Sequence, residues 1–407
     1  MRSDRKGSTA LAMAIFFAVT VEMAPAGAVG HIARDLHADV PAAAGGSAAY
    51  AIATAVVAVP CALLTRRMNL RRTVIATGVL FALAALATAT APNLETYLAL
   101  RAVNGAVHGA FFPVVLALAA ATDPDRPGRA VARVLLGNAC ALAVGVPLSE
   151  ALSGWGWQVP IGLAAAAVAV AALAAPKGAD VSTAEPPALR ALPWIAVAVP
   201  ALVFTMALAG HFSFYTYLSP LATQQGAVPS IILGAYGVAV IGGTMASGAL
   251  ANGRRTSRAA LIAGTQGLVL AAVALVQGVP AVAVGAVVAG VCFGLLPTIV
   301  QTEMLTRARG AETVASALAV VAFNVGIAGG AFGGGLAYPA GSTAPALVGG
   351  ILLGLAALAF AFTGFSRTRA DRGVSPSNQS VGTGRLTRGA STPTWAERVP
   401  ASKGRKA

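Results

Sequence analysis

The stretch RAVNGAVHGAFFP, residues 101–113, places an arginine and a histidine seven residues apart inside an apolar run from Leu94 to Ala121. A run of this length is typical of a helix that crosses a lipid bilayer, for which about 20 apolar residues are needed. An arginine at the centre of such a helix costs at least ~2.5–3.5 kcal/mol. We therefore expect this arginine to face protein or water, and the rest of the chain has to provide that environment.

The composition is that of a polytopic membrane protein. The 407 residues are 57% hydrophobic and 10% charged, whereas soluble domains carry about 25% charged residues. The net charge of +14 lies in short clusters between apolar runs, which favours membrane topology over nucleic-acid binding. The three cysteines lie in separate apolar runs without a CxxC or Cys/His cluster. We therefore expect no disulfide framework, no metal site and no cofactor.

Scanning for runs of about 20 apolar residues predicts twelve membrane-spanning helices. Long continuous runs without alternation favour helices over a β-barrel, so the predicted fold is all-α. The predicted spans are 9–30, 43–64, 73–91, 94–121, 130–152, 158–175, 191–217, 229–250, 259–277, 280–305, 313–337 and 345–365.

The basic residues predict the orientation. Of the 28 Lys and Arg residues, all except Arg34 and Arg101 lie at the two ends of the chain, or in or beside connections on the same side of the membrane as those ends. Because Lys and Arg are concentrated in cytoplasmic loops, both termini are predicted to be cytoplasmic, in a multi-pass protein of the cell (inner) membrane.

The predicted spans divide into two sets of six. The longest polar connection between spans follows the sixth span, and a basic loop follows both the second and the eighth span. A six-plus-six pseudo-repeat with a site between its halves is a transporter architecture. The predicted parts are a cytoplasmic N-terminus (1–8), an N-terminal six-helix bundle (9–175), a cytoplasmic linker (176–190), a C-terminal six-helix bundle (191–365) and a disordered basic tail (366–407).

Six stretches in order resemble the major facilitator superfamily, specifically the twelve-helix drug:proton antiporters related to arabinose efflux permeases. They are LLTRRMNLRRTV (63–74), RAVNGAVHGAFFP (101–113), GNACALAVGVPLSEALSGWGW (137–157), HFSFYTYLSPL (211–221), GLLPTIVQTEML (294–305) and AFNVGIAGGAFGGGLA (322–337). The resemblance implies the major facilitator fold, a monomer, and alternating access around one central cavity.

Two of these stretches are expected to serve gating and packing. Gly137, Gly145 and Pro147 match the antiporter motif of the fifth helix, which in the family packs the two halves; ordinary small-residue packing is the alternative. The basic loop after the second span departs from the family pattern, because it lacks the usual acid. Its basic residues serve either topology alone or the inner gate; they are Arg66, Arg67, Arg71 and Arg72.

The polar residues of the fourth predicted helix lie on one face. Residues at i, i+3, i+4, i+7 and i+11 share a face, and from Arg101 that face contains Asn104, Gly105, His108 and Phe112. Gly105 and Gly109 let a neighbouring helix approach closely. We expect this face to line a protein cavity, with Asn104, His108 and Phe112 as candidate substrate contacts. A packing role is the alternative for His108.

Glu22 is the expected partner of Arg101. It is the one acid deep within a predicted span, and at 1.5 Å per residue it lies roughly 12 Å from the outer end of its helix, against roughly 10 Å for Arg101. Pro25 should weaken the first helix nearby. Because ionisable residues within membranes are functional by default, the pair is the predicted proton-coupling site; a buried pair that only fixes helix packing is the alternative.

The C-terminal half supplies further candidate cavity residues. The stretch HFSFYTY (211–217) concentrates aromatic residues in a chain with 6% aromatic residues, and aromatic faces suit apolar or cationic ligands. An interfacial aromatic belt is the alternative. The candidates are His211, Phe214, Tyr215 and, in the eleventh helix, the lone polar Asn324.

Together these features predict a secondary transporter that exports a small lipophilic compound, a drug or a metabolite, in exchange for protons. The chain has no GxxxxGK[ST] segment, so we expect no ATP-driven step. No nucleophile–base or metal constellation appears, so we expect no enzyme. Two alternatives stay open: efflux of a sugar or metabolite with or without proton coupling, and a non-transporting membrane receptor.

Overall fold

The computed structural model describes residues 2–64, 68–123, 125–176, 194–308 and 312–373. These residues form helices and turns, without a strand in the described ranges, which confirms the all-α prediction. The helices of the first half are α1 (Arg2–Gly27), α2 (Val29–Asp35), α3 (Val40–Leu64), α4 (Leu70–Ala89), α5 (Leu94–Ala121), α6 (Pro127–Cys140), α7 (Val146–Leu152) and α8 (Gln158–Leu173).

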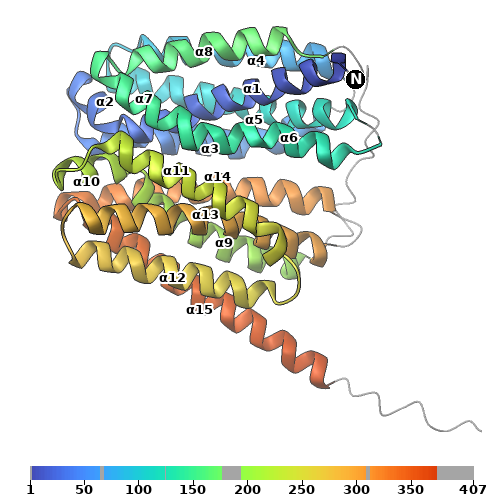
Figure 1. The fold of residues 1–407 in the computed structure, drawn as a ribbon, viewed down its shortest axis with the longest axis vertical. Helices are drawn as coiled ribbons and strands as arrows, with labels where there is room; N and C mark the ends of the chain where they lie inside the picture. The colour runs from blue at the N-terminus through green and yellow to red at the C-terminus, as the bar shows by residue number, and fades with distance from the viewer. Residues whose placement is uncertain (1, 65–67, 124, 177–193, 309–311, 374–407) are drawn as a thin grey trace, which may run out of the picture. The chain divides into compact units, whose positions relative to one another are not determined.

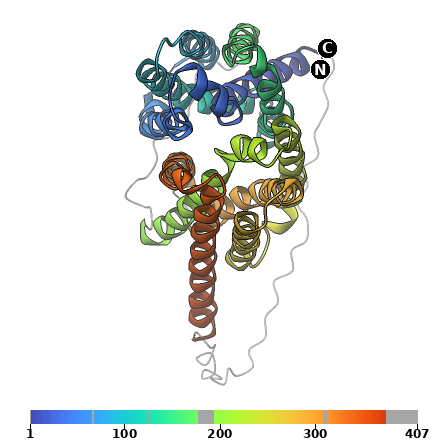
Figure 2. The same cartoon turned by 90° about the vertical axis from the view of Figure 1, so that its left-hand side faces the viewer.

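The second half contains α9 (Trp194–Tyr215), α10 (Leu218–Gln224), α11 (Pro229–Leu250), α12 (Arg255–Leu275), α13 (Val279–Arg307), α14 (Glu312–Ala337) and α15 (Ala344–Gly373). In Figures 1 and 2, α1–α8 form one bundle and α9–α14 form a second one beside it. The bundles meet where α3 lies against α14 and where α11 lies against the segment that joins α6 to α7.

The predicted spans agree with these helices. Within the described residues, eleven helical segments are long and apolar enough to cross a membrane, and the predicted span 158–175 is the shorter apolar helix Gln158–Leu173. The end segments differ from prediction, because α1 already begins at Arg2 and α15 continues to Gly373. Most of the predicted linker and the tail from residue 374 onward lie outside the described residues.

Glycines bring α3 and α5 into backbone contact in the first bundle. A Cβ at Gly105 would overlap the carbonyl oxygen of Tyr50, and a Cβ at Gly109 would lie 2.9 Å from the carbonyl oxygen of Thr54. The Thr54 hydroxyl donates a 2.9 Å hydrogen bond to the carbonyl oxygen of Gly105. The predicted close approach of a helix at both glycines is therefore present, and α3 is that helix.

The same contact recurs in the second bundle between α11 and α13. A Cβ at Gly290 would overlap the carbonyl oxygen of Tyr236, and one at Gly294 would overlap the carbonyl oxygen of Val240. In each bundle two glycines, four residues apart, face a tyrosine carbonyl and the carbonyl four residues later. This repeated contact relates α3 to α11 and α5 to α13, as a six-plus-six pseudo-repeat requires.

The C-terminal bundle contains a second glycine contact, between α14 and α9. Three glycines of α14, spaced four residues apart, meet the backbone of α9. A Cβ at Gly326 would lie 3.1 Å from the carbonyl oxygen of Thr205, and one at Gly330 would lie 2.5 Å from that of Ala209. A Cβ at Gly334 would lie 3.0 Å from the carbonyl oxygen of Ser213. Close approach of this kind replaces large interlocking side chains in helix pairs within membranes. Helices α9 and α14 therefore pack as a tight pair.

Gly105→Ala should strongly destabilise the protein, because α3 has to move to make room for the methyl group. Overpacking of a tight contact costs about 1–3 kcal/mol or more. The matched control is Gly242→Ala in α11, where no atom lies within 4 Å of an added Cβ; it should be neutral or stabilise the helix by up to about 1 kcal/mol. Thermal unfolding followed by fluorescence-detected size-exclusion chromatography measures both. Equal melting temperatures of the two variants would contradict the described α3–α5 contact.

Candidate functional site

Pro25 interrupts the hydrogen-bond ladder of α1 beside the guanidinium of Arg101. A proline at this position has no N–H to donate to the carbonyl oxygen of Val21, four residues earlier. Arg101 supplies that missing donor: Nη1 bonds to the Val21 carbonyl oxygen at 3.2 Å, and Nη2 bonds to the neighbouring Glu22 carbonyl oxygen at 2.9 Å. Nε donates to the carbonyl oxygen of Gly46 on α3 at 3.4 Å. Arg101 therefore joins α5 to the proline-interrupted segment of α1 and to α3.

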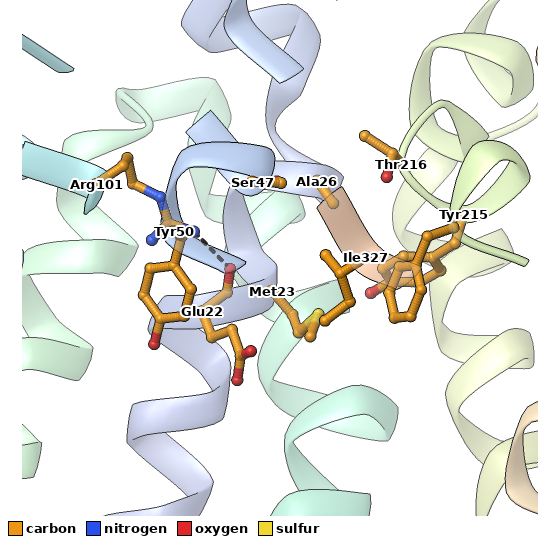
Figure 3. Close-up of a pocket in the computed structure, with 10 residues that line it drawn as sticks. Glu22, Met23, Ala26, Ser47, Tyr50, Arg101, Tyr215, Thr216 and Ile327 are labelled. Atoms are coloured by element: carbon orange, nitrogen blue, oxygen red, sulfur yellow. Dashed lines mark hydrogen bonds between the residues drawn. The ribbon is translucent and has the colours of Figure 1, made fainter. Parts of the chain in front are cut away.

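This arrangement differs from the expected ion pair between Arg101 and the Glu22 carboxylate. The guanidinium is 1% exposed and lies over the ring of Tyr50, 4.3 Å from the ring centre. Its hydrogen bonds reach the backbone of residue 22, and Figure 3 shows the carboxylate pointing away from it. Sequence depth placed the two residues at the same level, which agrees with the hydrogen bond from Arg101 to the backbone of residue 22. The guanidinium bonds to backbone carbonyl oxygens instead of the carboxylate, and one of them, at Val21, has no helical donor because Pro25 lacks an N–H.

His108 is a titratable side chain close to the Glu22 carboxylate. Its Nδ1 lies 3.7 Å from Glu22 Oε2, and the hydroxyl of Tyr50 is hydrogen-bonded to the same nitrogen. Glu22, Tyr50 and His108 come from α1, α3 and α5, so this acid–histidine–tyrosine cluster joins three helices. The Glu22 side chain is 14% exposed and the His108 side chain 5% exposed.

A small pocket lies beside this cluster, between the two bundles. Its wall from the first bundle includes Glu22 and Arg101, and its wall from the second bundle is largely aromatic or apolar (Figure 3). The lining residues are Glu22, Met23, Ala26, Ser47, Tyr50, Arg101, Phe212, Tyr215, Thr216 and Ile327. The pocket therefore brings Glu22 and Arg101 of the first bundle together with Tyr215 of the second.

His211 is held at both ring nitrogens inside the second bundle. The Gln266 amide donates to Nδ1 at 2.7 Å, and Nε2 lies 2.9 Å from the Tyr236 hydroxyl. A histidine that accepts at Nδ1 carries its proton on Nε2, so it donates to that hydroxyl. The ring also stacks on Phe293 with centroids 4.5 Å apart. His211 is thus a fixed part of an aromatic cluster behind the pocket wall and does not itself line the pocket.

The two buried clusters are related by the pseudo-repeat. In the first bundle Glu22 meets a histidine of α5 that bonds Tyr50; in the second, His211 meets Phe293 of α13 and bonds Tyr236. Because Tyr50 and Tyr236 occupy equivalent places in the glycine contacts, the acid of one bundle corresponds to the histidine of the other. The titratable acid is thus confined to one side of the pocket.

Other predicted cavity residues lie away from the pocket. The Asn104 amide donates to the Phe81 carbonyl oxygen of α4 at 3.1 Å, and the Asn324 amide donates to its own helix at Val320. Phe112 lies beside His108 with ring centres 5.5 Å apart. The Phe214 ring lies 3.5 Å from where a Cβ at Gly285 of α13 would be. A side chain can face the interior of its own bundle without reaching the pocket between the bundles. The spacing of polar residues along one helix does not distinguish these two cases.

Sequence reasoning missed Tyr50, Tyr236, Gln266 and Phe293 as parts of these clusters. The sequence contains the signal: the second and eighth predicted helices each contain one tyrosine, and the fourth and tenth each contain two glycines four residues apart. Aligning the halves on those glycines identifies both tyrosines. A single polar residue in an apolar helix, such as Gln266, does not stand out without that alignment.

The antiporter motif contains a backbone distortion. Residues Ala141–Gly145 form a π-turn between α6 and α7, in which the Val146 N–H bonds to the Ala141 carbonyl oxygen five residues back. Pro147 follows and has no N–H to restore the ladder. Gly237 of α11 packs directly against the Leu142 carbonyl. The motif therefore widens the helix at the seam between bundles, as the resemblance implied for packing of the halves.

The motif glycines contact the first helix as well. A Cβ at Gly137 would overlap the carbonyl oxygen of Ala12, and one at Gly145 would overlap the Thr20 hydroxyl. Both glycines thus hold α1 close to the helix that faces the second bundle.

Of the basic residues predicted at the inner gate, Arg71 has a structural partner for its side chain, and Arg72 is bonded through its backbone. Arg71 donates to the Ala175 carbonyl oxygen at 3.0 Å, and the Arg72 N–H is capped by the Asn69 side chain; Arg66 and Arg67 lie outside the described residues. In the second bundle, Glu303 bonds Arg307 at 2.8 Å and also Arg255 at 3.3 Å. Glu303 therefore belongs to a three-residue network with two arginines.

A second acid is buried in the seam between the bundles. Glu150 of α7 is 8% exposed; its carboxylate lies 4.0 Å from Nε2 of His31 and within reach of the Ser230 backbone N–H of α11. Burial, and then the charge of Arg34, lower the pKa of His31 below its usual value, so the imidazole is neutral at pH 7. Glu150 therefore contacts both bundles but lies outside the pocket.

Comparisons with known proteins agree with this architecture. The model of the Major Facilitator Superfamily matches residues 11–331. The chain is 34% identical to a chloramphenicol efflux pump of Mycobacterium tuberculosis, over 81% of this chain and 84% of the relative. It is 31% identical to a chloramphenicol resistance protein of Streptomyces lividans, over 86% of this chain and 95% of the relative.

Among solved structures, the crystal structure of the peptide transporter POT is similar in fold. It superposes with a TM-score of 0.73 over 90% of this chain and 95% of that one, at 13% sequence identity. Paired six-helix bundles, a seam between them and the match over most of the chain lead to one conclusion: this protein is a membrane transporter of the major facilitator superfamily.

Proposed function

We propose that this transporter exports a small, neutral, lipophilic compound of the chloramphenicol type in exchange for protons, by alternating access. The observation that carries the proposal is the pocket between the bundles, where one acid faces an aromatic and apolar wall. The two relatives named for chloramphenicol cover most of the chain. The positive charge of Arg101 offsets an ionised Glu22, so little net charge is left to attract a dication.

Glu22 is the proposed proton-binding group. Its carboxylate lies in the pocket wall, and the neighbouring nitrogen and hydroxyl of the His108–Tyr50 pair offer a partner on the protein side. A substrate that carries an O–H or N–H group donates a hydrogen bond to the ionised carboxylate and so favours that form. Substrate and proton then compete for the same group, which is the requirement for exchange.

Arg101 has a positioning role in this scheme. By bonding the carbonyl oxygens of Val21 and Glu22 it fixes the segment of α1 that presents the carboxylate. The His108 imidazole lies 3.7 Å from the carboxylate, while the predicted substrate contacts Asn104, Phe112, Phe214 and Asn324 act through packing. The aromatic wall of Phe212 and Tyr215 is the proposed apolar surface for substrate.

Transport of radiolabelled chloramphenicol into everted membrane vesicles tests the function. We expect accumulation when respiration makes the vesicle interior acidic, and its loss on adding a protonophore. A parallel assay with radiolabelled arabinose tests the alternative of sugar efflux. Arabinose accumulation without chloramphenicol accumulation would replace the proposed substrate. No flux of either in reconstituted liposomes would remove both compounds as substrates.

The proposed location is the cytoplasmic membrane with both termini in the cytoplasm, in a monomer. The support is the distribution of Lys and Arg, of which all but Arg34 and Arg101 fall at the ends of the chain or on their side of it. Reporter fusions after Ala184 and at the C-terminus should both show cytoplasmic activity. An external C-terminal reporter would contradict the even number of spans.

A further inference from the structure

The hydroxyl of Tyr215 is a buried polar group that lacks a hydrogen-bond partner. The side chain is 1% exposed, its oxygen has no partner among the described residues, and the residue lines the pocket. Figure 3 shows the hydroxyl pointing toward the space beside Met23 and Ile327. Because buried polar groups are nearly always paired, an unpaired hydroxyl that faces a pocket is available for a bound molecule.

Neighbouring rings fix the direction of this hydroxyl. The Tyr215 ring lies 4.7 Å from the Tyr236 ring and 5.8 Å, edge to face, from the Phe212 ring. It also stacks parallel to His211 at 6.2 Å. Both nitrogens of His211 are already bonded, so the imidazole does not compete for the Tyr215 proton. A group held in this way binds without a large cost of ordering.

The opposite wall of the pocket carries the complementary group. Glu22, from the first bundle, accepts hydrogen bonds when ionised, whereas a tyrosine hydroxyl donates as well as accepts. Tyr215 lies four residues after His211, and the position four residues after Glu22 on α1 is Ala26. Ala26, which corresponds to Tyr215 in the pseudo-repeat, also lines the pocket. The donor is therefore supplied by one bundle and the charged acceptor by the other.

We propose that the Tyr215 hydroxyl donates a hydrogen bond to an oxygen acceptor of the substrate while Glu22 accepts one from a donor of the same molecule. This inference rests on the proposed function. It names the substrate class as neutral lipophiles that carry an O–H or N–H donor and a separate oxygen acceptor. Purely apolar compounds lack both contacts and compounds with an acceptor alone lack the contact that displaces the proton.

Equilibrium binding of radiolabelled chloramphenicol to the purified full-length protein tests the proposal. Chloramphenicol carries hydroxyl and amide donors and has nitro and carbonyl oxygens as acceptors. Tyr215→Phe should weaken binding by about three- to tenfold, the range that one neutral hydrogen bond gives. Proton release on substrate addition should keep its wild-type pH profile at saturating chloramphenicol, because Glu22 is unchanged.

Tyr97→Phe is the matched control. The Tyr97 hydroxyl is also buried without a partner, but its ring packs on Trp157 at 5.7 Å and it does not line the pocket. Both substitutions remove one unpaired oxygen, so neither should lower the melting temperature of the free protein. Tyr97→Phe should bind chloramphenicol as the wild type does.

Two results would overturn the subsite. Unchanged affinity of Tyr215→Phe excludes the hydrogen bond while the proposed function stands, and an equal loss in Tyr97→Phe shows that the effect is not local to the pocket. Failure of the wild-type protein to bind chloramphenicol is distinct from both. It removes the proposed substrate, and this subsite with it.

Discussion

Glu22→Gln should abolish the accumulation of chloramphenicol in everted vesicles that is driven by a proton gradient. Glutamine resembles the protonated acid in shape but cannot take up or release a proton, so the exchange cycle stops. The pocket and its aromatic wall are retained, and the variant should fold and still bind substrate. Its affinity should no longer depend on pH over the range in which the wild-type affinity changes.

Glu150→Gln is the control for this experiment. Glu150 is also a buried acid on a helix that faces the seam, but it lies outside the pocket and beside His31. Its replacement should leave proton-driven accumulation in place. If Glu22→Gln accumulates chloramphenicol at the wild-type rate and still moves protons on substrate addition, the proton site lies elsewhere.

Arg101→Ala should cause the largest loss of folded protein among single substitutions in the pocket. It removes the two shorter hydrogen bonds of the guanidinium, to the carbonyl oxygens of Val21 and Glu22, and the Val21 oxygen then has no helical donor because Pro25 lacks an N–H. Hydrogen bonds from a charged group contribute about 1.5–3 kcal/mol each, so removing two of them should cost at least about 3 kcal/mol. Yield and melting temperature in detergent measure the loss.

A double variant distinguishes the carbonyl oxygens from the carboxylate as the main partners of Arg101. If the carboxylate were the partner, Glu22→Gln would relieve a buried unpaired charge and restore yield to Arg101→Ala. Because the hydrogen bonds go to the backbone, Glu22→Gln combined with Arg101→Ala should yield no more than Arg101→Ala alone. Arg101→Lys should be intermediate, since lysine keeps the charge but lacks the planar fork.

The sequence predicted the helices well because each signal was local. The span from Leu94 to Ala121 agrees with α5 residue for residue, since the apolar run follows Asn93, whose side chain caps the helix through the Thr96 N–H. Depth along a helix also follows from counting, which is why Glu22 and Arg101 lie at the same level. Hydropathy carries both kinds of information without knowledge of the neighbours.

The partners of the site residues were less predictable, because they depend on the direction that each helix face takes. Asn104 shares a face with Arg101 and His108, yet its amide bonds to α4. The choice between the carboxylate and the carbonyl oxygens of α1 depends on rotation about the helix axis, which a single sequence does not give. Glycines that let helices touch were visible, whereas the carbonyl oxygens they meet, at Tyr50 and Tyr236, were not.

The bundles meet at two places, α3 with α14 and α11 with the α6–α7 segment. The π-turn at Ala141–Gly145 makes these two places unequal in stiffness. At the α3 contact, the second bundle contributes α14, which is a continuous helix and is held against α9 of its own bundle at three glycines. At the other contact, the ladder between α6 and α7 is widened and then interrupted by Pro147. Bending stiffness along a helix comes from that ladder, so rocking of one bundle against the other should flex this side first. Backbone amides around the π-turn should accordingly exchange hydrogen for deuterium sooner than those of α14 at the same depth.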